Sequence, residues 1–138
     1  RGLGISVLAR EEIVFALPPG AAGAGIGDAM ARLPFLHFMP ETGIGRLIAR
    51  HLAARDLAPA RQIELDGIEA TVECVRAGVG FTALPRPDLE RYGGGALTLL
   101  PARPPIMRAL ALVARAGAPA DAERDRLAAL MTGAAGEA

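Results

Sequence analysis

The fold is decided by residues 35–85, which read FLHFMPETGIGRLIARHLAARDLAPARQIELDGIEATVECVRAGVGFTALP. Compact apolar runs predict strands at 35–39, 62–65 and 79–84, and apolar residues at helical spacing predict helices at 43–55 and 68–78 between them. Short connections in a β-α-β-α-β order favour a parallel, right-handed sheet covered by helices. We therefore expect an α/β domain.

Local signals place the ends of these two helices. Thr42 is a helix cap, and the helix after it turns Ile44, Leu47, Ile48 and Leu52 to one face. The segment Asp66-Gly67-Ile68-Glu69 has the spacing of a capping box, with Asp66 as the cap. Gly78 is a left-handed stop for the second helix.

The flanking segments extend this pattern without completing it. We expect a loop at 20–27, short helical pieces at 28–33 and 88–92, and a bend at 101–105. The final helix is expected at 120–131, with Leu127, Leu130 and Met131 facing inward. Further strands are expected at 3–8, 12–17, 97–100 and 106–115. These flanks lie outside the β-α-β-α-β core, as part of a second layer or subdomain would.

The composition excludes several functions. The 138 residues carry fifteen Arg, no Lys and fifteen acidic residues, so the net charge is zero and no basic block marks a nucleic-acid surface. Residues 13–27 are uncharged, but Pro18 and Pro19 break the run, which is shorter than the roughly 18 to 20 residues of a membrane helix. We expect a cytoplasmic chain with no membrane contact.

Residues that often perform catalysis or bind metals are sparse. The chain has two histidines, His37 and His51, and one cysteine, Cys74, and their spacing matches no metal site, so we expect structural roles and Cys74 as a small buried side chain. The Gly-rich stretch 20–27 has no GxGxxG register, and a phosphate loop needs the Lys that this chain lacks. No catalytic residue, metal or cofactor is expected.

One segment stands above this background. Pro40-Glu41-Thr42-Gly43 joins a strand end to a helix start, and Gly43 and Gly45 both fall in the first helical turn. Glycine there costs about 1 kcal/mol relative to alanine, so either an anion approaches the backbone amides or the helix packs tightly or has a loose first turn. Asp66 and Gly67 end a neighbouring strand at the same sheet edge, where such sheets bind ligands.

The order of segments is similar to a known family. LPFLHFMPETGIGRLIARHL, at 33–52, is followed by a short strand and then by GIEATVECVRAGVGFTALP, at 67–85. This series resembles the effector-binding domain of LysR-type transcriptional regulators, and VRAGVGFTALP, at 75–85, resembles the helix-to-strand passage of that family most specifically. The resemblance covers roughly residues 3–131.

The resemblance implies a fold like that of type-2 periplasmic binding proteins, with one complete subdomain, 20–100, and part of another, 1–19 and 101–138. A small, anionic effector would bind between the subdomains, at Pro40, Glu41, Thr42, Gly43, Asp66 and Gly67. The helix at 43–55 would pack across a homo-oligomer. DNA would be bound only by a winged helix upstream of this chain.

Two other functions remain open at this stage. The same fold serves type-2 solute-binding proteins of transport systems, which an upstream signal peptide would indicate. A small α/β enzyme that uses Cys74 or a histidine is the third possibility, and retained activity in a Cys74→Ser variant would remove its thiol version.

Overall fold

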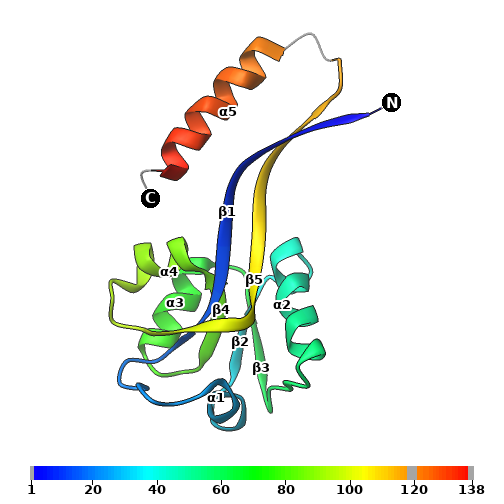
Figure 1. Ribbon diagram of the computed structural model, residues 1–138. Coiled ribbons are helices and arrows are strands. Elements are labelled where there is room, and N and C mark those ends of the chain that lie inside the picture. The colour runs from blue at the N-terminus through cyan, green and yellow to red at the C-terminus, as the bar shows by residue number, and fades with distance from the viewer. Residues whose placement is uncertain (1, 118–120, 137–138) are drawn as a thin grey trace. The chain divides into compact units, whose positions relative to one another are not determined.

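The computed structural model describes residues 2–117 and 121–136. Two compact units are present (Figure 1). The central unit is the continuous segment 12–106, and the terminal unit is formed by the chain up to Glu11 and from Met107 onward. In chain order the elements are β1 (Leu3–Leu17), α1 (Ile26–Arg32), β2 (Phe35–Phe38), α2 (Gly43–Ala54), β3 (Gln62–Leu65), α3 (Ile68–Arg76), β4 (Phe81–Pro85), α4 (Arg86–Gly93), β5 (Thr98–Arg115) and α5 (Asp121–Gly136).

The strands form one mixed sheet in the order β3-β2-β4-β1-β5. Strand β2 pairs in parallel with both β3 and β4, and β1 pairs with β4 in the antiparallel direction. The predicted parallel β-α-β-α-β segment is therefore confirmed. Its strands are almost fully buried except for the edge strand β3, which has exposed side chains.

Helices cover both faces of the sheet in the central unit. Alternate residues of β1 divide between two clusters, because successive side chains of a strand point to opposite faces. Phe15 packs with α1 and α2 on one face, and Val14 packs with α3 and α4 on the other. The buried Thr82 donates its hydroxyl to the Leu36 carbonyl at 2.6 Å, so this interior polar group is satisfied.

Four strands predicted at the flanks are in fact two. The segments 3–8 and 12–17 belong to the single strand β1, because the two carboxylates at their junction are accommodated by ion pairs. Glu11 pairs with Arg108 at 2.6 Å and Glu12 pairs with Arg86 at 3.0 Å. The predicted bend at 101–105 lies within β5, whose place at the sheet edge tolerates proline.

The final helix differs from the prediction in length and in packing. Helix α5 extends to Gly136, and position 120 lies outside the described residues. Three side chains that were expected to face inward are 47%, 65% and 43% exposed, namely Leu127, Leu130 and Met131. The prediction of a buried face is therefore wrong. The described terminal unit contains segments of only two strands and this helix, which leaves its apolar side chains without a second layer to cover them.

Candidate functional site

The turn between β2 and α2 is organised by Thr42. This residue is the N-cap of α2, as predicted, and its hydroxyl oxygen accepts the Gly45 N–H at 3.5 Å. The same hydroxyl donates its hydrogen to the Met39 carbonyl at 2.7 Å. Because that hydrogen is already donated within the turn, Thr42 can offer a ligand only an acceptor lone pair. The backbone amides of the first helical turn remain the donors at this position.

The two glycines of α2 have different reasons to be glycine. A Cβ at Gly45 would lie 2.4 Å from the Met39 carbonyl oxygen and 2.5 Å from Pro40 Cα, so the turn folds directly against this position. A Cβ at Gly43 would meet nothing within 4 Å. Tight packing therefore accounts for Gly45, whereas the space over Gly43 is open to an approaching molecule.

His37 of β2 contacts the start of α2 from the sheet side. Its side chain is buried in β2, and its Nε2–H donates to the Gly45 carbonyl at 3.4 Å, since a carbonyl can only accept. The Phe35 ring lies 5.2 Å from the imidazole. The expected structural role is consistent with these contacts, which fix the first turn of α2 relative to the sheet.

The strand register brings the two predicted turns together. Phe38 of β2 is opposite Leu65 of β3, and the Met39 amide donates to the Leu65 carbonyl at 2.9 Å. The turns that follow the two strands, which contain Pro40 and Asp66, therefore leave the sheet at the same edge. This is the carboxyl edge of the parallel strands, where ligands bind in sheets of this kind.

The second turn differs from its predicted form. Gly67, not Asp66, is the N-cap of α3, and no side chain caps this helix. The Gly67 carbonyl instead accepts the Thr71 hydroxyl at 2.7 Å and the Thr71 amide at 3.0 Å. The prediction of a capping box is therefore wrong. Asp66 is exposed, and its carboxylate is available for other contacts.

A cavity of about 450 Å³ lies between the two turns. Four of the six predicted site residues line it, namely Pro40, Glu41, Thr42 and Asp66, and sequence reasoning missed the other lining residues, Met39, Glu64 and Leu65. Gly43 and Gly67 are the adjacent helix-start residues and do not line it. The strand alignment of β3 with β2, which a single sequence does not reveal, would have been needed to find Glu64.

The charges around this cavity are of one sign. Glu41, Glu64 and Asp66 are its ionisable lining residues. These carboxylates accept hydrogen bonds, whereas the N-terminus of α2 presents amide donors and the positive end of the helix dipole. The arrangement fits a small molecule with hydroxyl groups on one side and an acidic group facing the start of α2.

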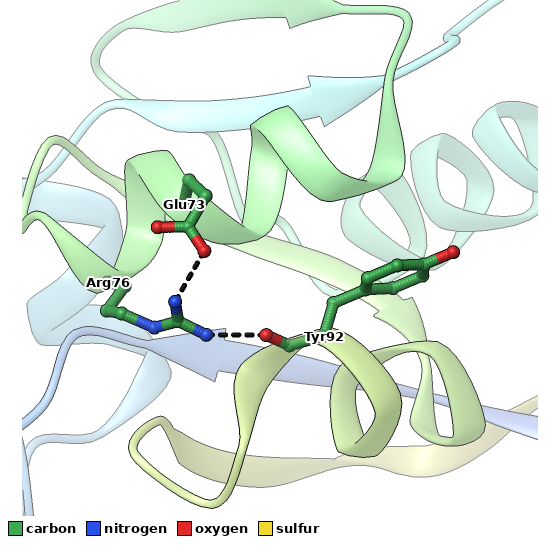
Figure 2. Close-up of polar contacts among 3 residues, drawn as sticks. All are labelled: Glu73, Arg76 and Tyr92. Carbon is green, nitrogen blue, oxygen red and sulfur yellow. Dashed lines mark hydrogen bonds and ion pairs between the residues drawn. The ribbon is translucent and has the colours of Figure 1, made fainter.

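A further polar contact fixes α3 against α4. Figure 2 shows Arg76 between the side chain of Glu73, three positions earlier on α3, and the backbone carbonyl of Tyr92 on α4. The guanidinium donates to both, so the end of α3 is held to the end of α4.

Cys74 on the same helix is half-buried, which corrects the expectation of a buried side chain.

The described part of the chain holds neither a metal-binding cluster nor a membrane-spanning helix. Within residues 2–117 and 121–136, no three His, Cys, Asp or Glu side chains gather in a way that could hold a metal ion. No helix in those ranges has the length and apolar character to cross a bilayer.

Comparison with known families decides the relationship. A sequence model of the LysR substrate binding domain matches residues 1–135. The chain belongs to the LysR substrate binding domain family. The resemblance and the type-2 periplasmic-binding-protein-like fold expected from the sequence are thereby confirmed.

Solved structures of other LysR-type regulatory domains have the same fold. The CcmR regulatory domain of Synechocystis PCC6803 in complex with 2-PG has a TM-score of 0.77 and 18% identity, over 96% of this chain and 66% of that one. The reduced OxyR2 regulatory domain of Vibrio vulnificus has a TM-score of 0.71 and 16% identity, over 95% and 65%. The effector binding domain of QuiR in complex with shikimate has a TM-score of 0.71 and 19% identity, over 91% and 63%.

This LysR substrate binding domain chain therefore spans about two thirds of the length of each of these solved chains. No curated protein sequence matches it significantly.

Proposed function

We propose that this chain is the effector-sensing part of a LysR-type transcriptional regulator, and that the cavity at the β2–α2 and β3–α3 turns is its share of the effector site. The observation that carries the proposal is the convergence of both turns at the carboxyl edge of the parallel strands, around an open cavity of about 450 Å³. Membership of the family favours this reading over a transport solute-binding protein or an enzyme.

The chemistry of the cavity narrows the effector. An acidic group would accept hydrogen bonds from the first-turn amides of α2 beside Gly43, where the space is open. Hydroxyl groups would donate to Glu41, Glu64 and Asp66, whose charges would repel a second acidic group. We therefore assign the effector to the small hydroxylated carboxylic acids. QuiR binds a molecule of this class, shikimate.

The remaining parts of the proposal concern the whole regulator. Binding would act without catalysis by shifting the population of conformations in a homo-oligomer, with α2 in the subunit contact. DNA would be bound by a winged helix outside this chain. A regulator of this kind works in the cytoplasm.

Isothermal titration calorimetry of the full-length regulator with shikimate, and with 2-PG as a second probe, tests the assignment. Glu64→Gln removes one carboxylate that a hydroxyl would contact, and we expect it to weaken shikimate binding about five- to tenfold, as for the loss of a charged hydrogen bond. Glu90→Gln makes the same chemical change at an exposed position on α4, away from the cavity, and is the matched control. Equal affinity of the wild type and Glu64→Gln for shikimate would refute this placement of the site.

A further inference from the structure

Met39, at the end of β2, has an unusual backbone for a residue with a side chain. Its φ is 41°, in the left-handed region, where a Cβ lies too close to the following carbonyl oxygen. Among the described residues, the only other non-glycine residue with a positive φ is Asp56, and aspartate is one of the few residue types enriched in this region. Methionine is not, so position 39 is strained.

The turn at the start of α2 holds the Met39 backbone in this conformation. The Met39 N–H donates to the Leu65 carbonyl at 2.9 Å, and the Met39 carbonyl accepts the amide and the hydroxyl of Thr42 at 3.0 and 2.7 Å. The same carbonyl oxygen lies directly against Gly45. The turn therefore requires a left-handed residue at position 39, and a glycine would adopt this conformation without strain.

The side chain of Met39 contributes little to the packing of the central unit. It is 39% exposed, and neither of the two core clusters formed by the described residues includes it. Strained residues persist where the surrounding structure determines their backbone, and they gather at ligand sites. The strain and the exposure together indicate that this side chain has a role other than stability.

Met39 lies in the wall of the effector cavity, which is the cavity between the β2–α2 and β3–α3 turns. Met39, Pro40 and Leu65 form the apolar part of its lining, and the accessible wall is mainly apolar. The carboxylates of this cavity can bind only the polar groups of a ligand, so the hydrocarbon surface of the ligand is left to the apolar part. A methionine side chain is flexible and polarisable, and it adapts to the shape of the surface that it contacts.

We propose that Met39 is a specificity-determining residue of the effector cavity, and that it selects hydroxylated acids built on a hydrocarbon ring over open-chain polyhydroxy acids. The proposal rests on the effector function proposed above. The part of a ring that carries no hydroxyl group would pack on Met39 and Leu65. An open chain with a hydroxyl group on each carbon offers no such surface.

The test compares two acids by calorimetry with the full-length regulator: shikimate, a hydroxylated ring, and gluconate, an open polyhydroxy chain. We expect the wild type to bind shikimate about fivefold more tightly than gluconate, roughly the effect of burying one methylene group. Met39→Gly should weaken shikimate binding and remove this preference, whereas Met39→Leu should keep it. Ile63→Ala, which shortens a side chain of similar exposure (42%) outside the cavity, is the control and should change neither affinity.

A second measurement depends on no ligand. Met39→Gly and Met39→Ala both remove the contacts of the side chain, but only glycine is free of strain at a φ of 41°. We expect the glycine variant to unfold at a higher urea concentration than the alanine variant. The opposite order would show that position 39 is not strained and would overturn the argument.

Two results of the calorimetry would also overturn the proposal. One is an equal loss of shikimate and gluconate affinity in Met39→Gly, because a general loosening of the turn weakens both ligands alike. The other is an unchanged shikimate affinity in Met39→Gly while Glu64→Gln weakens binding, which removes the role of Met39 and leaves the effector site in place. Unchanged shikimate affinity in both variants would refute the effector site itself.

Discussion

Gly45→Ala is the sharpest perturbation that the structure offers at the candidate effector site. The added methyl carbon would lie 2.4 Å from the Met39 carbonyl oxygen, 2.5 Å from Pro40 Cα and 2.6 Å from the Pro40 carbonyl oxygen. All three are backbone atoms of the turn, so a side-chain rotation cannot relieve the overlap. The turn and α2 must move apart.

The expected magnitude follows from two opposing terms. Inserting a methyl group into a tightly packed site costs about 1–3 kcal/mol, and contacts this short with rigid backbone belong at or above the upper end. Alanine returns about 1 kcal/mol through its better helix propensity. We expect a net loss of about 2 kcal/mol or more in the free energy of unfolding.

Gly43→Ala is the matched control. Its methyl group would meet nothing within 4 Å, so only the gain in helix propensity remains, and we expect a stabilisation of about 0.4–1 kcal/mol. Urea unfolding followed by circular dichroism measures both variants. If the Gly45→Ala variant is as stable as the Gly43→Ala variant, the inference that the turn packs closely on α2 at Gly45 is wrong.

Three further perturbations test other features. Thr42→Val removes the cap of α2 and should cost about 1 kcal/mol in urea unfolding, and an unchanged midpoint would show that the cap contributes nothing. Arg76→Gln breaks the tie to the Tyr92 carbonyl and should lower the melting temperature by an amount corresponding to about 1 kcal/mol, whereas Glu73→Gln, which leaves that tie intact, should cost less. Since burial lowers the pKa of His51 in the folded state, the unfolded chain takes up the proton first as the pH falls through 6.5, and the free energy of unfolding decreases there. His51→Gln should reduce this decrease in the urea midpoint at acid pH. The same pH dependence of the midpoint in His51→Gln and the wild type would contradict the prediction.

The central α/β pattern could be predicted from the sequence because its signals are local. The periodicity of 43–55 and the cap at Thr42 each depend on neighbouring residues, and both are found in α2. The predicted bounds of β3, 62–65, are the observed ones for the same reason. Local chemistry is enough where burial and backbone preference agree.

The errors arose where distant residues decide the outcome. The continuity of β1 depends on Arg86 and Arg108, which are far away in the chain and pair with Glu12 and Glu11. Glu64 could not be predicted as a cavity residue, because only the alignment of β3 with β2 sets its position. Asp66 matched a capping box in spacing, yet the Gly67 backbone begins α3 without a side-chain cap.

The central unit has one property with a practical use. It is a single continuous segment, and it begins on β1 and ends on β5, which are neighbouring strands of the sheet. Ile13 and Ile106, near its two ends, belong to the same core cluster. A segment with adjacent ends can be inserted into a surface loop of another protein without forcing the ends of that loop apart. Residues 12–106 therefore form a cassette with which ligand occupancy could be coupled to the signal of a fluorescent host protein.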